Sequence, residues 1–297
     1  MDRDTFIITV YCLVVEYYQL VKDKYPLRRG GFPPALTDQE VITMELCGAY
    51  FKLHSDKDLF DYFQSHYRHF FPALRDRPSF VRQAANLWHV KANIWHLIIK
   101  RSGQAQARVQ VIDTLPLPVC TYTRSRRDRC FKTLADYGHC AAKKLSYYGF
   151  KLGLRVSPIG MITHFPLLSA RAHDVTHTTA LVEGFAGLCL ADKGFIDPFR
   201  QSLLFQRYGV KILTPVRSNM TAEPPPAFRQ FGSRVRKIVE TVGSHLTERF
   251  AVDAIRVHDL WHFQHRLIRK VLSHTVMVLL NLQMGRDPLD LDGLVSA

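Results

Sequence analysis

The sequence lacks the cysteine patterns of a disulfide-stabilised or zinc-finger protein. Only six of its 297 residues are cysteine, and no pair is spaced CxxC. Cys120, Cys130 and Cys140 recur at ten-residue steps, with His139 beside the last. Zinc ligands usually include a closely spaced pair, so reduced thiols in a cytoplasmic protein are the simpler interpretation, with zinc as the alternative.

Long hydrophobic runs are missing as well. The apolar run at residues 6–15 stops at Glu16, and the residues before it are Asp2, Arg3 and Asp4 rather than a basic cluster. A membrane span needs roughly 18 apolar residues, and a signal peptide needs a basic start and a cleavage site of small residues. We therefore expect a buried helix here, and a soluble, intracellular protein without a membrane partner.

Acidic residues are in short supply. Lys and Arg number 40 against 26 Asp and Glu, which gives a formal net charge of +14. Such an excess predicts a polyanionic partner, nucleic acid before any other, although a generally basic soluble protein is the alternative. The length and the 47% hydrophobic content predict one large domain plus a smaller one.

Two of the scarce acids end short apolar runs. The stretch RVQVIDTLPLPVC (108–120) places Asp113 at the end of an alternating strand and before a segment that contains prolines. The stretch GLCLADKGF (187–195) places Asp192 in the matching position, at the end of an apolar run. In an open α/β sheet, ligands bind beyond the carboxyl ends of parallel strands. If the two strands are parallel neighbours, both carboxylates emerge at the same edge.

The hydrophobic pattern predicts helices first and a sheet second. Residues 1–105 are typical of helices, and Thr37 and Glu40 match a capping box. Residues 106–297 alternate strands with helices, an order that predicts parallel pairing. The expected helices cover 37–50, 57–67, 78–98, 175–185, 197–208, 232–249 and 259–284, and the expected strands cover 109–113, 146–156, 161–168, 187–192 and 210–216.

A third acid is expected beside the first two. Two half-buried carboxylates repel each other, and a divalent cation with oxygen ligands removes that conflict. The best candidate is Glu240, which lies off the apolar stripe of an amphipathic helix and one turn after Arg236. The alternative for Glu240 and Arg236 is an ordinary surface ion pair.

Motifs along nearly the whole chain resemble one family. They are LTDQEVITMEL (36–46), YRHFFPAL (67–74), VIDTLPLPVC (111–120), ADYGHCAAKKLSYYGFKLGL (135–154), ADKGFID (191–197), RKIVETVGSHL (236–246) and RLIRKVLSHTVMVLLNLQMG (266–285). In this order they resemble the DDE transposases of bacterial insertion sequences, most of all the 982 family of these elements. Arg236 and Glu240 fit the Tyr-Arg-Glu-Lys pattern of related transposases, whereas Ser233 and Thr247 replace its Tyr and Lys.

The resemblance implies a fold and a domain organisation. The fold is α/β, with a ribonuclease-H-like mixed sheet flanked by helices and an N-terminal all-helical domain. Residues 1–105 would be the helical, DNA-binding domain. Residues 106–297 would be the catalytic domain, with a basic loop at 119–145 and C-terminal helices.

The resemblance also implies an activity. Asp113, Asp192 and Glu240 would be the catalytic residues and would hold two Mg²⁺ ions, for which Mn²⁺ would substitute. The implied reaction is cleavage of DNA at the ends of the element, followed by strand transfer into target DNA. The implied partners are terminal inverted repeats and target DNA, with a homo-oligomer assembled on them in the bacterial cytoplasm at the nucleoid.

The basic loop at 119–145 would lie near the site and contact phosphates, or would simply be a solvated charged loop. Its aromatic residues Tyr122, Phe131 and Tyr137 would stack on bases or pack in the core. The residues predicted to contact DNA are Arg124, Arg126, Arg127, Arg129, Lys143, Lys144, Lys193 and Arg236.

His173 and His177 superficially match the HExxH pattern of zinc proteases, with Asp174 in place of the glutamate. We interpret Asp174 more simply as the N-cap of the helix expected at 175–185.

Two other functions remain open. One is a related two-metal nuclease without strand transfer, and the other is a DNA-binding protein that has lost catalysis. Intact acids at all three positions argue against the second.

Overall fold

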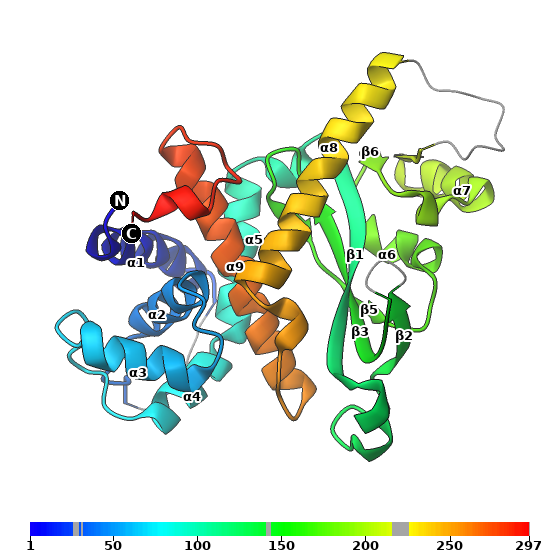
Figure 1. Ribbon diagram of the computed structural model, residues 1–297. Helices are drawn as coiled ribbons and strands as arrows, with labels where there is room; N and C mark the ends of the chain where they lie inside the picture. The colour runs from blue at the N-terminus through cyan, green and yellow to red at the C-terminus, as the bar shows by residue number, and fades with distance from the viewer. Residues whose placement is uncertain (26–29, 31, 141–143, 216–225, 297) are drawn as a thin grey trace. The chain divides into compact units, whose positions relative to one another are not determined.

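The chain folds into two compact units (Figure 1). The computed structural model describes residues 1–25, 30, 32–140, 144–215 and 226–296. The helical unit comprises Met1–Ile98, His245–Val252 and Val257–Ala297, and the sheet unit comprises Ile99–Ser244 and Asp253–Arg256. This grouping differs from the boundary expected near residue 105, because the C-terminal helix packs against N-terminal helices.

The helical unit is built from helices with mutually buried apolar faces. They are α1 (Arg3–Lys22), α2 (Asp38–Tyr50), α3 (Asp56–His66), α4 (Arg77–Asn86), the first part of α5 (Trp88–Arg101), and α9 (Leu260–Gln283). The predicted capping box starts α2: the Thr37 backbone N–H donates to Glu40 Oε2 (2.7 Å), and the Glu40 N–H donates to Thr37 Oγ1 (3.2 Å). The helices expected at 37–50, 57–67 and 259–284 are confirmed.

The helix expected over 78–98 is two helices. Helix α4 ends at Asn86, because Leu87 takes φ −88° and ψ 9° and leaves the helical region. Helix α5 begins at the next residue, Trp88. Neither Pro nor Gly marks this break, and the apolar periodicity continues through it, so the sequence pattern gives no sign of it.

The centre of the helical unit holds a buried ionic cluster. Lys91 Nζ lies 2.5 Å from Glu45 Oε2, and both side chains are fully buried. Arg269 Nη1 lies 3.6 Å from Glu45 Oε1 and 2.9 Å from Asp56 Oδ1, and His265 Nδ1 lies 2.9 Å from Lys91 Nζ. Burial raises the pKa of Glu45 and lowers that of Lys91, so each charge depends on its partner to stay ionised.

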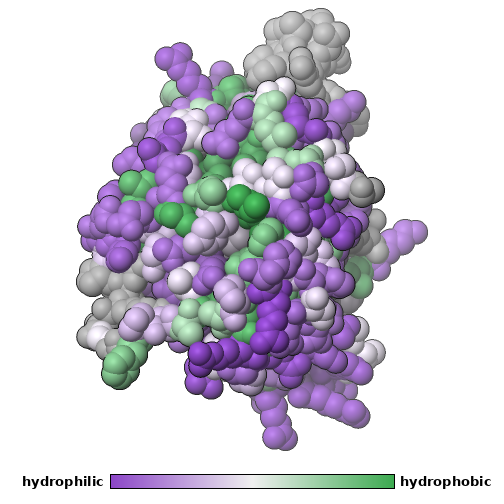
Figure 2. Space-filling view, turned by 90° about the vertical axis from the view of Figure 1, so that its left-hand side faces the viewer, coloured by the Kyte–Doolittle hydropathy of each residue, from purple (hydrophilic) through white to green (hydrophobic). Residues whose placement is uncertain are grey.

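Helix α1 contributes to the core and is also apolar on part of its outer face. The Tyr18 hydroxyl donates to Asp38 Oδ2 (2.8 Å) in a buried contact with α2, whereas Ile8 and Tyr11 are exposed. Figure 2, which faces the left-hand side of Figure 1, shows hydrophobic side chains in small groups among hydrophilic ones. The helix extends well beyond the run at 6–15 and is long and apolar enough to cross a membrane, a test that a buried core helix also passes.

The sheet unit contains one mixed sheet with the strand order β2-β3-β1-β6-β7. The strands are β1 (Val109–Thr121), β2 (Asp136–Cys140), β3 (Leu145–Val156), β4 (Ile162–His164), β5 (Leu167–Ser169), β6 (Gly187–Leu190) and β7 (Val210–Leu213). Strand β3 runs antiparallel to β1, β2, β4 and β5, whereas β6 is parallel to β1 and β7 is parallel to β6. The fold is therefore the expected ribonuclease-H-like mixed sheet with helices, accompanied by an N-terminal helical region.

Strand β1 does not stop at its prolines. It pairs with β3 as far as Thr121, with Pro116 opposite Lys151. Strand β6 pairs with β1 only from Val109 to Val111, so the later part of β1 has one open edge. Proline is tolerated at such an edge because no neighbouring strand needs its missing N–H. The expected strand at 109–113 was therefore too short.

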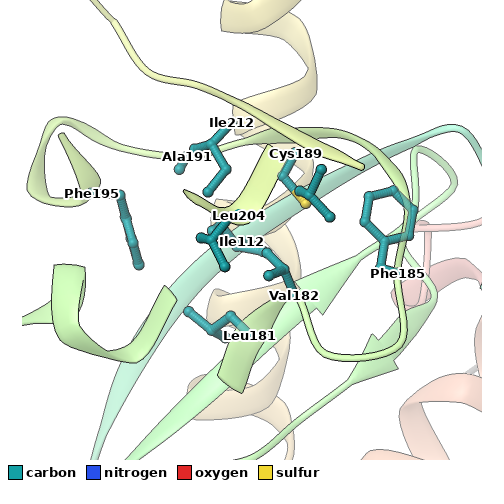
Figure 3. Close-up of a cluster of buried hydrophobic side chains, with 10 residues drawn as sticks. Ile112, Leu181, Val182, Phe185, Cys189, Ala191, Phe195, Leu204 and Ile212 are labelled. Carbon is teal, nitrogen blue, oxygen red and sulfur yellow. The ribbon is translucent and has the colours of Figure 1, made fainter. Parts of the chain in front are cut away.

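Different helices cover the two faces of the sheet. They are α6 (Thr178–Leu181), α7 (Pro198–Tyr208) and α8 (Pro226–Ser244). Ile112 points into a buried cluster with residues of α6, α7, β6 and β7 (Figure 3). Side chains alternate along a strand, so Asp113 and Leu115 point to the opposite face. Helix α8 packs on this opposite face of the sheet. Its Gly243 is so close to the Leu115 side chain that a Cβ added to the glycine would lie 3.3 Å from Leu115 Cδ2. Asp113 therefore faces α8.

Several expected elements are shorter or divided. The expected helix at 175–185 is a 3₁₀ turn, Asp174–His177, followed by the four-residue α6. The strand at 161–168 is divided into β4 and β5, and the basic loop at 119–145 contains β2. The helix expected at 232–249 is the end of α8 followed by a π-helical turn.

Candidate active site

Strands β1 and β6 place the first two acids at the same sheet edge. The parallel ladder pairs Val109 with Leu188 and Val111 with Leu190, an offset of 79 residues. Asp113 and Asp192 differ by the same 79 (192 − 113). Asp192 follows β6 in extended backbone, with φ −76° and ψ 171°, so the register continues toward it.

Helix α8 brings Glu240 to the same place, with Arg236 between the acids. Arg236 Nη2 lies 3.2 Å from Asp192 Oδ1 and 3.6 Å from Glu240 Oε1. The two carboxylates are 55% and 61% exposed, so each ion pair contributes little to stability. The surface pair considered for Glu240 does exist, but the same guanidinium also holds Asp192. One cation thus spans acids from two different elements.

Asp113 is the least exposed of the three acids. Its pKa is raised to about 6, first by burial and then by the charges of Asp174, Asp192 and Glu240. The Thr114 backbone N–H donates to Asp113 Oδ1 (2.8 Å) and partly opposes this shift. No lysine or arginine in the described part of the chain forms an ion pair with Asp113. The site therefore carries an excess of negative charge around this carboxyl group.

A fourth acid, Asp174, belongs to this neighbourhood and was missed as a site residue. Its Oδ1 accepts hydrogen bonds from Thr114 Oγ1 and Lys151 Nζ, both at 2.9 Å. The N-cap role expected for Asp174 is wrong, because His173 occupies the cap position and Asp174 caps no backbone N–H. Both donors are far from Asp174 in the sequence, Thr114 on β1 and Lys151 on β3, so no local sequence signal points to this site.

The zinc alternatives find little support in the geometry. Cys120, Cys130 and Cys140, which recur at ten-residue steps, form no disulfide, and the described residues hold no group of three His, Cys, Asp or Glu side chains close enough for a metal. His177 Nε2 lies 3.0 Å from the carbonyl oxygen of Ser169 and so is engaged by backbone. Burial lowers the pKa of His177.

The acids have the chemistry that a divalent cation needs, but their side chains are not arranged around one. In the described residues, no three His, Cys, Asp or Glu side chains stand close enough together to hold a metal ion. The donors are carboxylate oxygens, which Mg²⁺ and Mn²⁺ prefer. Asp113 has no cationic partner among the described residues, and Arg236 occupies the space between Asp192 and Glu240. A cation would therefore be held by Asp113, Asp192 and Glu240 once Arg236 gives way.

The residues predicted to contact DNA fall in separate places. Arg236 and the exposed Lys193 border the acids. Lys144 is exposed just before β3, with a φ of 46°, and Lys143 lies outside the described residues. The four arginines of the β1–β2 connection are all exposed: Arg124, Arg126, Arg127 and Arg129.

The β1–β2 connection does not lie beside the acids, contrary to the sequence-based expectation. Strand β1 continues eight residues past Asp113, to Thr121 (121 − 113). At about 3.3 Å per residue, that separates the arginines from Asp113 by about 25 Å. The expectation failed because it ended the strand at Asp113.

Comparison with known proteins identifies the family. Residues 103–260 match the family described as "Transposase DDE domain". This segment is more than half of the chain and includes Asp113, Asp192 and Glu240. The chain therefore belongs to the transposase DDE domain family.

A similar solved structure is the "Cryo-EM structure of piggyBac transposase synaptic complex with hairpin DNA (SNHP)". It is 14% identical, with a TM-score of 0.48, over 96% of this chain and 76% of that chain. No curated protein matches the chain.

Proposed function

We propose that this chain is the transposase of a bacterial insertion sequence of the 982 type, which cuts DNA at the ends of its element and joins them to target DNA. The observation that carries the proposal is the transposase DDE domain match, which contains Asp113, Asp192 and Glu240. The link from Asp192 through Arg236 to Glu240 supports the same assignment.

Asp113, Asp192 and Glu240 would hold two Mg²⁺ ions, for which Mn²⁺ substitutes. When bound, such ions activate an attacking oxygen and stabilise a leaving oxygen in phosphoryl transfer. The chain contributes the placement of the ligands. Asp113 lies on β1, Asp192 follows β6 in extended backbone, and Glu240 lies on α8, where Arg236 links it to Asp192.

Arg236 would have a role before and after the cation binds. Before binding, its guanidinium holds Asp192 and Glu240 together against their mutual repulsion. After release from the carboxylates it remains at the same edge, where a phosphate of bound DNA is a suitable partner for its fork of N–H donors.

The reaction consists of two in-line displacements. In the first, the oxygen of water bonds to phosphorus at the element end, and the 3′ oxygen leaves as a hydroxyl. In the second, that 3′ hydroxyl oxygen bonds to a phosphorus of target DNA, and the target's own 3′ oxygen leaves. The number of phosphodiester bonds is conserved in the second step. Neither step requires a serine or tyrosine nucleophile or a covalent bond between protein and DNA.

The basic residues would bind DNA on either side of the acids. Lys193 and Arg236 would contact phosphates next to the cleaved bond, and the arginines of the β1–β2 connection would contact DNA farther along, together with Lys143 and Lys144. Residues 1–105 would recognise terminal inverted repeats, and copies of the chain would assemble on DNA in the cytoplasm, at the nucleoid.

A product assay tests this function. Purified protein, Mg²⁺ and an end-labelled duplex of the DNA that flanks the gene should give cut ends with 3′ hydroxyls, and then products joined to a plasmid. Cut ends without joined products would favour a two-metal nuclease. Binding without cutting would favour a DNA-binding protein that has lost catalysis.

A further inference from the structure

Two tyrosines lie exposed side by side at the far end of β1. Tyr122 begins the 3₁₀ segment Tyr122–Arg127, which directly follows β1, and Tyr137 belongs to β2. Tyr122 is 56% exposed and Tyr137 is 45% exposed. Their ring centroids are 5.3 Å apart, at an interplanar angle of 55°. Two neighbouring aromatic rings that are exposed to solvent favour the binding of a planar group.

The protein holds this pair in place. Ser125 Oγ donates to the carbonyl oxygen of Tyr122 (2.6 Å) and lies 3.0 Å from the hydroxyl of Tyr137. Behind them, the buried ring of Tyr148 lies 5.1 Å from that of Tyr137, and its hydroxyl donates to the carbonyl oxygen of Phe131 (3.1 Å). These contacts hold the ring of Tyr137 and the backbone of Tyr122 in place before any ligand arrives, which lowers the entropic cost of binding.

The surroundings of the pair are positively charged. The four arginines of the same connection are exposed, and none forms an ion pair with a carboxylate among the described residues. The nearby acid, Asp128, is engaged in its own turn, where its carboxylate accepts the backbone N–H groups of Cys130 and Phe131 (3.3 and 3.2 Å). Charge of this sign beside two exposed aromatic rings fits a polyanion that also carries flat aromatic groups, which describes a nucleic acid strand.

We propose that Tyr122 and Tyr137 form a stacking platform for an unpaired base of DNA, a proposal that rests on the proposed function. In a duplex, the faces of paired bases are covered by the neighbouring base pairs. Only an unpaired or extruded base therefore has a face that can stack on the tyrosines. The arginines hold the backbone of the same strand. The platform lies about 25 Å from Asp113, which corresponds to roughly seven base pairs of DNA. It would therefore hold DNA away from the cleaved bond.

Fluorescence binding tests the platform directly. The probe is a short single-stranded oligothymidylate that carries one aminopurine base, whose emission falls when it stacks on an aromatic ring. The full-length protein should quench the probe, and Tyr122→Ala should weaken binding by roughly five- to a hundred-fold. Tyr122→Leu should lose the quenching as well, because leucine keeps apolar area but has no ring. Affinity for a blunt duplex should stay the same in both variants.

The controls separate stacking from charge and from folding. Tyr11→Ala removes a tyrosine that is 37% exposed on α1, and it should bind the probe as the unmodified protein does. Arg126→Gln should weaken the binding of single strands and duplexes alike and reduce its salt dependence. If both Tyr122 variants bind and quench the probe as the unmodified protein does, the proposal is overturned. Metal-dependent cleavage of a duplex by the same proteins reports separately on the proposed function.

Discussion

Asp192 lies opposite Asp113 in the continued register of β6 and β1, two residues beyond the last paired positions, Val111 and Leu190. Where β6 ends, the edge of β1 opens, and α8 brings Arg236 and Glu240 to this opening. The acids are therefore assembled by a parallel strand pair and by one helix laid over its end. This arrangement needs no contribution from the helical unit, and it makes the consequences of changing each residue specific.

Removing the charge of Asp192 should stop DNA cleavage without unfolding the protein. The side chain is 55% exposed and its main contact is with Arg236, so Asp192→Asn should change the free energy of unfolding by at most about 1 kcal/mol. Cleavage of a labelled element-end duplex in Mg²⁺ should become undetectable. Asp136→Asn is the matched control, because its carboxylate accepts from Ser169 Oγ, which an amide oxygen can also do. Cleavage by Asp192→Asn at the rate of this control would refute the role of Asp192.

Asp113 should make the metal-free protein less stable as the pH rises. Its pKa is about 6 in the folded protein, against 3.8 for an aspartate in its ordinary, solvated state, so the folded state binds the proton more tightly. The stability it contributes is present at and below about pH 4 and is lost as the pH rises through 6, up to about 3 kcal/mol in all. In EDTA, Asp113→Asn should therefore become increasingly more stable than the unmodified protein between these values. Urea unfolding of both proteins, measured in EDTA across this pH range, checks this prediction. If the free energies of unfolding of the two proteins changed in parallel with pH, the prediction would be contradicted.

The neighbouring acid should contribute to the same pH dependence. Asp174→Asn keeps an oxygen that can accept from Thr114 Oγ1 but removes a negative charge that raises the pKa of Asp113. The loss of stability between pH 4 and pH 6 should therefore become smaller in this variant. The same urea series measures the effect. A profile identical to that of the unmodified protein would mean that Asp174 does not influence Asp113.

Arg236 should compete with divalent cations for Asp192 and Glu240. Arg236→Gln removes the competing charge, so Mn²⁺ should bind more tightly, by roughly five-fold if the released ion pairs contribute about 1 kcal/mol. Calorimetric titration of the DNA-free protein measures this affinity. Lys237→Gln makes the same change of charge at the next, exposed position of α8 and should leave the affinity as it is. Weaker Mn²⁺ binding by Arg236→Gln would show that the arginine supports the cation site instead.

The buried ionic cluster should make the helical unit sensitive to the loss of one charge. Lys91→Met leaves Glu45 buried without its 2.5 Å partner and should lower the free energy of unfolding by about 3–5 kcal/mol. Adding Glu45→Leu should restore most of this loss, because no charge then remains unpaired at that position. Denaturant unfolding measures both, with Lys57→Met on the exposed side of α3 as the control. A double variant as unstable as Lys91→Met alone would contradict this explanation.

Much of the site's framework could be predicted from local sequence. The alternation of residues 109–113 and 187–192 predicts strands, and strands that alternate with helices predict parallel pairing, which places Asp113 and Asp192 at one edge. The capping box at Thr37 likewise depends only on residues close together in the sequence. Such signals are local, and they were confirmed where the structure tests them.

The features that the sequence did not reveal depend on contacts between distant residues. Strand β1 continues through Pro116 because β6 ends early, a fact about the neighbouring strand. Asp174 accepts hydrogen bonds from Thr114 and Lys151, which are distant in the sequence, whereas its neighbouring residues alone permit a helix cap. The grouping of α9 with the N-terminal helices depends on buried partners such as Glu45 and Asp56. None of these is visible in a window of neighbouring residues.

The most direct test of the central claim is a crystal structure of the protein with Mn²⁺, collected at a wavelength where manganese scatters anomalously. The account predicts an anomalous peak bounded by carboxylate oxygens of Asp113, Asp192 and Glu240, with Arg236 displaced from the two acids that it now contacts. Crystals of Asp113→Asn grown in the same way should lack that peak. A peak elsewhere, or none beside these three residues in the unmodified protein, would contradict the account.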